Sequence, residues 1–431
     1  MSPALAVLLA MLMVTLILRL PVGFGMLVSG VAYLGYQRQD LGLAAEQVLN
    51  GLYNGYILLA VPLFIFAAAV MNSGTISERL FDFAQLIVGR VRGGLAHVNI
   101  VVSVIFSGMS GSAIADAAGP GIVSIRMMEK NGYSPAFSGA LTAASSTIGP
   151  IIPPSIPLVI YAMLSGASVG ALFLAGVIPG LMMAAALMLA VHFIARRRNL
   201  PRGEPMARSA VPRILARGLL PLTLPAVLLG GIYSGVFTPT EAASVAALYA
   251  LVLAGLAYRA LSWSRLYEIL VESAKASASV TLIIAAAFVI NYAFAAENVP
   301  ALVAASLTGL DLSPVGFLVL VNIVFLILGC FLDTTILLLV VVPVLLPTAR
   351  LLGIDLVHLG VVLAVNMMIG LVTPPFGMLL FVINALAGVP LKAMIREAWV
   401  FIAVLVAALT VMTFLPQTVL WLPRVMGYAG G

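Results

Sequence analysis

The stretches Gly149-Pro-Ile-Ile-Pro-Pro154 and Gly370-Leu-Val-Thr-Pro-Pro375 decide the fold. Each interrupts an apolar run, at about 134–163 and 356–388, that is otherwise longer than a membrane crossing requires. A tandem proline removes backbone donors and disrupts the helix, which leaves carbonyl groups without helical partners. In hydrocarbon such groups are tolerated only where they face a cavity or a ligand. The two stretches are in register at an offset of 221 residues, so the sequence predicts two related halves, each with a broken helix at the midplane.

The composition around these stretches is that of a membrane protein. Of 431 residues, 63% are hydrophobic and only 8% are charged, whereas a soluble domain carries about 25% charged residues. A chain of this size cannot hide so much apolar surface in a water-soluble fold. Soluble enzymes, nucleic-acid-binding proteins and disordered proteins are therefore excluded, and we expect an all-α polytopic membrane protein.

Hydropathy predicts ten membrane crossings and two interrupted regions. The interrupted regions, at about 94–130 and 314–350, have small or polar residues in the middle, so each forms either two crossings or one re-entrant helical hairpin. The ten runs long enough to cross a core of roughly 30 Å are at about 3–18, 21–36, 56–72, 134–163, 171–195, 218–236, 239–260, 275–296, 356–388 and 397–421. The amphipathic stretches at about 77–90, 262–274 and 389–396 are expected along the membrane interface.

The positions of the basic residues decide between hairpins and full crossings. The central loop holds a cluster of arginines between positions 196 and 217, and short loops rich in Lys and Arg stay in the cytoplasm. With both interrupted regions as hairpins, all of the 21 basic residues except Arg38, Arg350 and Arg424 lie on the cytoplasmic side, and both termini lie outside. Each half then has five crossings and one hairpin, and because five is odd the halves are inverted, as in secondary transporters. We assign the first repeat to 1–198, the cytoplasmic basic loop to 199–217 and the second repeat to 218–431.

Two carboxylates inside the hairpin arms point to a cation site. Asp116 and Asp333 lie at depth without a Lys, Arg or His beside them, and an intramembrane carboxylate is costly unless it has a function. Without a basic partner such a group favours a proton or a metal cation. Together with Ser, Thr and Asn oxygens and free carbonyl groups, it suits an alkali cation such as Na⁺. The alternative is that each aspartate only stabilises the start of a helix through the helix dipole.

Four motifs resemble the large membrane subunit of TRAP transporters, the tripartite ATP-independent periplasmic transporters of bacteria and archaea. The resemblance extends over essentially the whole chain. The motifs are Ser107-Gly-Met-Ser-Gly-Ser-Ala-Ile-Ala-Asp116, Ile148-Gly-Pro-Ile-Ile-Pro-Pro-Ser-Ile-Pro157, Phe237-Thr-Pro-Thr-Glu-Ala-Ala243 and Gly370-Leu-Val-Thr-Pro-Pro-Phe-Gly377.

The resemblance implies a transport function and two protein partners. Such a subunit pairs with a small four-helix membrane subunit and receives its substrate from a periplasmic binding protein. It imports an organic acid, such as a C4-dicarboxylate or a sialic acid, by an elevator movement that is coupled to a Na⁺ gradient across the inner membrane. Because the chain starts directly at the large subunit, we expect the small subunit to be a separate polypeptide. No enzymatic activity, organic cofactor or nucleic acid is expected.

The candidate site residues surround the hairpin tips and the helix breaks. For some of the small residues among them the alternative is that they only allow close helix packing. We assign substrate binding to Ser112, Asp116, Ser145, Ser146 and Ser155. We assign Na⁺ binding to Ser107, Ser110, Thr147, Gly149, Gly329, Asp333, Asn366, Gly370 and Thr373.

Other classes of membrane protein remain as alternatives. The first is a stand-alone Na⁺- or H⁺-coupled carrier of organic anions that needs no binding protein. The second is a membrane enzyme or a proton-conducting subunit of a redox complex, which would need chains of His, Lys or Glu across the membrane; the three histidines, His97, His192 and His358, are too scattered for that. The third is a channel, which an inverted repeat disfavours.

Overall fold

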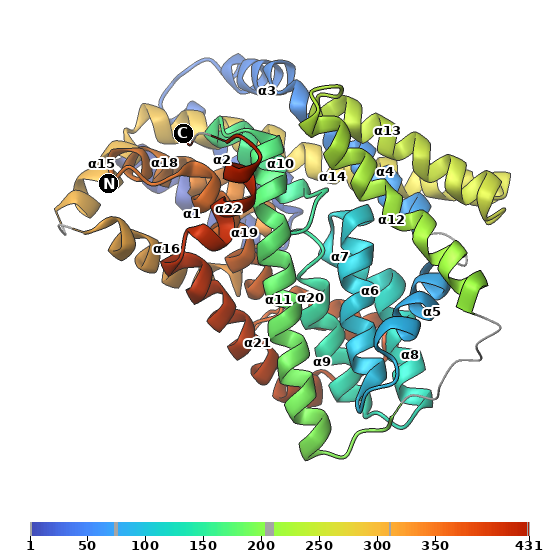
Figure 1. The fold of residues 1–431 in the computed structure, drawn as a ribbon. Helices are drawn as coiled ribbons and strands as arrows, with labels where there is room; N and C mark the ends of the chain where they lie inside the picture. Colours follow the sequence, from blue (N-terminus) through green and yellow to red (C-terminus); the bar gives the residue numbers. More distant parts are fainter. Residues whose placement is uncertain (1, 73–75, 203–210, 310–311, 429, 431) are drawn as a thin grey trace.

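The computed structural model describes every residue except 1, 73–75, 203–210, 310–311, 429 and 431. The described residues form helices joined by short turns, as drawn in Figure 1, and an isolated antiparallel bridge joins Arg92 and Arg202. The predicted all-α fold is therefore confirmed. Residues 203–210 of the predicted cytoplasmic loop lie outside the described part. The last residues of that loop are helical, because α12 already begins at Val211.

The first half contains helices α1 to α11. The 3₁₀ turn at 56–59 precedes α4, and a π-helical segment at 117–121 joins α7 to α8 into one continuous arm. The helices are α1 (Pro3–Ile17), α2 (Val22–Tyr36), α3 (Gly42–Asn54), α4 (Ala60–Met71), α5 (Ile76–Val88), α6 (Gly94–Ser110), α7 (Ala113–Asp116), α8 (Ile122–Lys130), α9 (Pro135–Ser146), α10 (Ile156–Ser165) and α11 (Val169–Arg197).

The second half contains helices α12 to α22. Its π-helical segments lie at 253–257 and at 337–341, and the latter joins α17 to α18. The helices are α12 (Val211–Tyr233), α13 (Pro239–Val252), α14 (Trp263–Ala296), α15 (Val299–Thr308), α16 (Pro314–Gly329), α17 (Thr334–Ile336), α18 (Val342–Leu351), α19 (Leu356–Gly370), α20 (Met378–Ala387), α21 (Leu391–Phe414) and α22 (Gln417–Val425).

Several helix starts follow from local capping chemistry. The hydroxyl groups of Ser134 and Ser313 accept hydrogen bonds from backbone N–H groups of the first turns of α9 and α16, and a proline follows each serine. Thr238 and Glu241 form a reciprocal capping box at the start of α13, as the sequence Thr-Pro-Thr-Glu predicts. These caps satisfy backbone donors that would otherwise lack partners at the helix ends.

The two halves pack against each other in reciprocal pairs. Helix α9 packs on α21 of the other half, and its counterpart α19 packs on α11. Helix α2 packs on α14, and α13 packs on α4. The hairpin arm α6 contacts α9, just as α16 contacts α19. A repeat related by a two-fold axis requires this exchange of equivalent contacts, whereas the inverted insertion of the halves in a membrane stays a prediction.

The described helices include fewer long crossings than the ten that hydropathy predicts. Helices α9, α10, α19 and α20 have only 10 to 15 residues each because the proline stretches divide their runs. A bent pair, Gly42–Tyr53 with Tyr56–Met71, would add one span to the six helices that are long and apolar enough to cross alone. These six are Val169–Arg197, Ile214–Tyr233, Pro239–Ala257, Trp263–Ala296, Thr334–Leu351 and Leu391–Phe414.

Two predicted interfacial stretches are continuous with membrane helices. The stretch at 262–274 is part of the 34-residue α14, and residues 391–396 are the first turns of α21. Neither helix contains a proline or glycine, so the sequence provides no break at which an interfacial segment could turn away. These stretches are thus continuous with the helices that follow them, and their place at the membrane interface stays a prediction.

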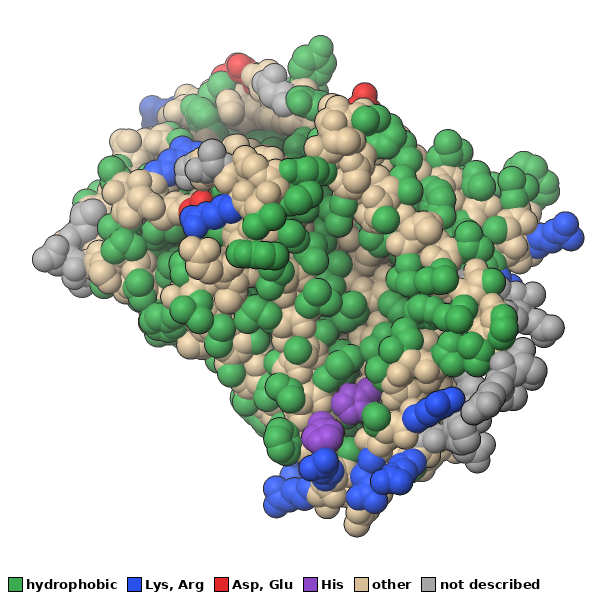
Figure 2. Space-filling model, viewed as in Figure 1, with side chains coloured by type: hydrophobic (Ala, Val, Ile, Leu, Met, Phe, Trp, Pro, Cys, Tyr) green, Lys and Arg blue, Asp and Glu red, His purple; other side chains and the backbone are tan. Residues whose placement is uncertain are grey.

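The surface agrees with a multi-pass membrane protein. Figure 2 shows hydrophobic side chains over much of the visible face, with Lys and Arg gathered at its lower end beside two histidines. Large apolar side chains such as Phe193 and Leu256 are 68% and 75% exposed, which a soluble surface would not show over so wide an area.

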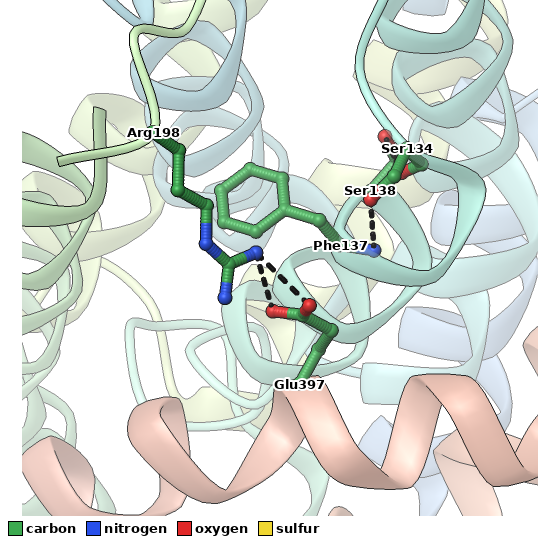
Figure 3. Close-up of polar contacts among 5 residues, drawn as sticks. All are labelled: Ser134, Phe137, Ser138, Arg198 and Glu397. Carbon is green, nitrogen blue, oxygen red and sulfur yellow. Dashed lines mark hydrogen bonds and ion pairs between the residues drawn. The ribbon is translucent and has the colours of Figure 1, made fainter. Parts of the chain in front are cut away.

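One polar contact joins the halves at the end of α11. The guanidinium of Arg198 donates to both carboxylate oxygens of Glu397 on α21, each at 2.9 Å, and lies 5.9 Å from the ring centroid of Phe137 on α9 (Figure 3). The Phe137 ring in turn packs on that of Phe401, with 5.8 Å between centroids. The contact thus connects α9 and the end of α11 to α21.

A second polar contact joins α2 to the residue directly after α14. Tyr33 and Gln37 both donate to the same carboxylate oxygen of Glu297, each at 3.0 Å. Hydrogen bonds from the side chains of Ser2, Tyr33 and Gln37 hold the pKa of the Glu297 carboxyl below its ordinary value.

Candidate functional site

The tip of the first hairpin meets the first helix break. Helix α6 ends at Ser110, and Gly111 turns the chain in the left-handed region, with φ 59°. A Cβ atom at Gly111 would lie 2.3 Å from the carbonyl oxygen of Pro154, and one at Gly149 would lie 3.4 Å from that of Ser112. Glycine at position 111 therefore permits both the turn and the close approach of the two backbones.

The second hairpin meets the second break in the same way. A Cβ atom at Gly370 would lie 2.8 Å from the backbone Cα, C and O atoms of Gly329. The two tandem prolines, Pro153-Pro154 and Pro374-Pro375, are each joined by a cis peptide bond. Each hairpin tip is thus in direct backbone contact with the broken helix of its own half.

A buried polar cluster lies beneath the first tip. The hydroxyl of Ser103 donates to that of Ser145 at 3.0 Å, and Ser145 donates to the side-chain oxygen of Asn99 at 3.1 Å. Asn99 itself donates to the hydroxyl of Thr142 at 2.6 Å. These four side chains, from α6 and α9, are buried. The cluster directs several oxygen atoms into one buried region.

Asp116 belongs to this first cluster. Its carboxylate is fully buried, and the hydroxyl groups of Ser103 and Ser146 are close enough to interact with it. Among the described residues, however, neither carboxylate oxygen has a hydrogen-bond partner within the usual geometry, and the same is true of the Ser146 hydroxyl. A buried carboxylate without partners is strongly destabilising unless a proton or a cation compensates its charge.

The equivalent cluster lies beneath the second tip. The Asn366 side chain donates to the backbone carbonyl and to the side-chain oxygen of Asn322, both at 2.9 Å, and Asn322 donates to Thr413 at 2.8 Å. The Asn366 side-chain oxygen and the Thr334 hydroxyl are buried, and neither has a partner among the described residues. Ser145 and Asn366 occupy equivalent positions in the two broken helices. In each half the residue at this position is hydrogen-bonded to an asparagine of the first hairpin arm, Asn99 on α6 or Asn322 on α16.

Sequence analysis missed six members of these clusters, three of which, Asn99, Ser103 and Asn322, lie on the hairpin arms α6 and α16; the other three are Thr142, Thr334 and Thr413. A polar residue inside an apolar hairpin arm was the available signal. The motifs mark the hairpin tips and the helix breaks, whereas Asn99, Ser103 and Asn322 lie one or more turns below the tips.

A central cavity of about 600 Å³ connects the two tips. Its wall includes Ser110 and Ser112 of the first tip and Asp333 and Thr335 of the second, facing polar residues of α14 such as Ser279. The helical arms that begin at Ala113 and Thr334 start at this cavity, and the positive ends of their dipoles favour an anion there. Cavities of this size suit small organic ligands.

The predicted substrate residues do not all line this cavity. Ser112 does, whereas Asp116, Ser145, Ser146 and Ser155 are buried away from its wall. Ser155 caps α10 by accepting from the N–H of Leu158 and donates to the carbonyl of Pro150.

Several predicted Na⁺ ligands have local roles in the structure. Ser107, Thr147 and Thr373 donate to backbone carbonyls three or four residues before them, and the Ser110 hydroxyl accepts from the N–H of Ser112. Asp333 is half-buried and caps α17 by accepting from the N–H of Thr335 at 2.8 Å. Their hydroxyl and carboxylate oxygens retain free lone pairs in these arrangements.

The fold and the site define a membrane transport protein of the hairpin-and-broken-helix class. The chain belongs to the family described as the tripartite ATP-independent periplasmic transporter, DctM component, which matches residues 9–418. The resemblance that the four motifs indicate is thereby confirmed, and the family is one of transporter permeases.

Relatives of this chain act in transport, as their names state. It is 42% identical over 411 residues to the sialic acid TRAP transporter large permease protein SiaM of Vibrio cholerae, which covers 95% of this chain and 96% of the relative. It is 42% identical over 375 residues to the C4-dicarboxylate TRAP transporter large permease protein DctM of Pseudomonas aeruginosa, covering 86% and 87%. Among solved structures, the YdaH transporter of Alcanivorax borkumensis shares the fold, with a TM-score of 0.63, 14% identity, and 85% and 86% coverage.

Proposed function

We propose that this chain is the transport subunit of a Na⁺-coupled importer of carboxylate-containing organic acids. The observation that carries the proposal is the pair of equivalent buried clusters, each with oxygen atoms that have no partner among the described residues. Hard cations prefer oxygen ligands, and the unwound backbone at broken helices supplies carbonyl groups for Na⁺ in secondary transporters. We assign one Na⁺ to each cluster.

In this proposal Asp116 moves from the substrate set to the first Na⁺ set. Its carboxylate lies in the buried cluster and not on the cavity wall. A cation bound between Asp116, Ser103 and Ser146 would compensate the buried charge. In the second cluster Asn366, Asn322 and Thr334 supply the side-chain oxygens, and the carbonyl groups near Gly329 and Gly370 complete the site.

The substrate is proposed to bind in the central cavity. Sialic acid and C4-dicarboxylates, the ligands named for two relatives, share a carboxylate group. The hydroxyls of Ser110 and Ser112 can donate to that carboxylate, and the helix starts beside them favour its charge. Two Na⁺ ions bound beneath the tips add further positive charge, so cation and substrate raise each other's affinity.

The family also guides the proposal for partners and location. We infer that the chain has two partners, a small membrane subunit and a periplasmic binding protein. We also infer that it lies in a bacterial or archaeal inner membrane, with both termini on the outer side. Movement of the hairpins and broken helices as one elevator unit is consistent with the reciprocal packing of α9 on α21 and of α19 on α11.

Uptake by proteoliposomes tests the proposal. The purified chain is reconstituted with its small subunit, and uptake of labelled organic acids is measured with and without a Na⁺ gradient and with and without the binding protein. We expect uptake only when both are present. Uptake that needs Na⁺ but no binding protein would support the stand-alone carrier, and uptake indifferent to Na⁺ would refute the cation sites.

Variants connect the function to the clusters. Asp116→Asn keeps the size of the side chain but removes its charge, and an interaction with a charged group contributes about 1.5–3 kcal/mol. The half-saturating Na⁺ concentration should therefore rise about tenfold or more. Glu46→Gln, at an exposed carboxylate of α3, is the matched control and should leave this concentration unchanged.

A further inference from the structure

A basic pocket lies far from the proposed transport site, between α5, α6 and the end of α11. Its volume is about 560 Å³. None of the described residues in its wall carries a carboxylate, so every side chain of this wall is either basic or uncharged. The polar side chains in the wall are Arg90, Arg92, Arg196, Arg202, His97 and His192.

The backbone holds this pocket together. The N–H of Gly93 donates to the carbonyl of Pro201 at 2.9 Å, and the guanidinium of Arg92 donates to the side chain of Asn199 at 3.1 Å. The segment after α11 is thereby attached to the turn between α5 and α6. The arginines are brought together by these contacts although they come from three parts of the sequence.

Three of the arginines are available for a ligand. Among the described residues, Arg90, Arg196 and Arg202 have no hydrogen-bond or ion-pair partner for their side chains, and all three are exposed. Among the described residues, Arg198 forms an ion pair, but with Glu397 and outside the pocket wall. Several unpaired guanidinium groups around one pocket repel one another, and a phosphate group, which accepts bidentate hydrogen bonds from arginine, would relieve this repulsion.

The pocket lies beside an apolar surface. Leu189 and Phe193, on α11 next to His192, are 60% and 68% exposed, and Ile87 and Val91 at the other edge are 58% and 49% exposed. Figure 2 shows two histidines and several basic side chains below a hydrophobic face. A ligand with a phosphate head and apolar chains fits both parts at once, whereas free phosphate would use only the pocket.

We propose that this pocket binds the phosphate headgroup of an anionic phospholipid, whose acyl chains lie along the exposed apolar side chains of α5 and α11. Basic pockets between membrane helices on the cytoplasmic side bind headgroups of this kind. Cardiolipin, with two phosphates, should bind more tightly than phosphatidylglycerol, and both more tightly than zwitterionic phosphatidylethanolamine. The site is independent of the proposed transport function.

Native mass spectrometry of the purified full-length chain with each of these lipids tests the proposal. In Arg90→Gln/Arg196→Gln we expect cardiolipin affinity to fall about thirtyfold, because each arginine near a membrane surface contributes about fivefold. Arg126→Gln/Arg259→Gln removes the same charge outside the pocket wall and should change the affinity by less than about twofold. Thermal unfolding without lipid shows whether both variants fold like the parent chain.

Two outcomes would overturn the proposal. The first is an equal loss of cardiolipin binding in the two double variants, which would mean that only net charge matters. The second comes from an arm with inorganic phosphate alone: if phosphate binds with the same dependence on Arg90 and Arg196 while the three lipids bind equally well, the ligand is a soluble phosphate and not a lipid.

Discussion

Replacing Gly370 by alanine tests whether contact between the second hairpin tip and the second break is required. A Cβ atom there would lie 2.8 Å from three backbone atoms of Gly329. Real Cβ atoms do not come so close to backbone, and neither chain can rotate away as a flexible side chain would. Overpacking of this kind costs about 1–3 kcal/mol. The tip must therefore separate from the broken helix or the variant must lose stability.

Gly35→Ala is the matched control. Gly35 also lies in the last turn of a 15-residue helix, α2, and a Cβ atom there would meet no atom within 4 Å. Alanine in place of a helical glycine stabilises by about 0.5–1 kcal/mol at most. The two substitutions are chemically identical but should have opposite effects, with a difference of roughly 1.5–4 kcal/mol.

The assay combines stability with function. Thermal unfolding in detergent, followed by intrinsic fluorescence, should give a lower apparent melting temperature for Gly370→Ala and an equal or higher one for Gly35→Ala. The half-saturating Na⁺ concentration for uptake should rise only in Gly370→Ala, because its second cluster is displaced. If both variants melt like the parent chain and need the same Na⁺ concentration, the close approach of Gly329 and Gly370 is not needed and the reasoning is refuted.

Three further predictions concern polar contacts outside the buried clusters. Asp333→Asn should retain uptake, because asparagine also caps a helix, whereas Asp333→Ala should lose about 1 kcal/mol of stability; loss of uptake in Asp333→Asn would instead show that the charge itself is needed. In a double-mutant cycle, Arg198→Gln and Glu397→Gln should show a coupling energy of about 0.2–1 kcal/mol that decreases with salt, and no coupling would mean that the pair is dispensable. The lowered pKa of Glu297 means that its hydrogen bonds stabilise the fold above the carboxyl's ordinary pKa, and that this stabilisation is lost as the pH falls through the lowered value. Glu297→Gln should therefore melt earlier than the parent chain at pH 7 and like it under strongly acidic conditions, and equal melting temperatures at both pH values would contradict this.

The positions of the hairpins and breaks could be read from the sequence because their causes are local. Gly149 and Gly370 precede tandem prolines, and a helix cannot continue through them whatever surrounds it. The interrupted region at 94–130 is divided into α6 and the α7–α8 arm at Gly111. The continuity of α14 was missed because amphipathicity describes which face of a helix is polar and does not show where a helix ends.

The composition of the candidate site could be read only in part. Asn366 and Ser145 were found because they flank the breaks, but their partners Asn322 and Asn99 lie 44 and 46 residues away in the chain. Asp116 could be recognised as a site residue because its depth in the membrane is visible in the sequence, whereas the side on which its carboxylate lies is not. That side depends on how the α7–α8 arm packs against α9.

The sequence by itself determined the all-α membrane fold, the two helix breaks and the transporter family, because hydropathy, proline chemistry and motif spacing act within short stretches of chain. Only the tertiary structure decided which oxygen atoms share a buried cluster, which side chains line the central cavity and that four arginines surround one pocket. These features depend on contacts between helices that are distant in the chain, and the free energy of such contacts depends on distances and burial that no local pattern contains.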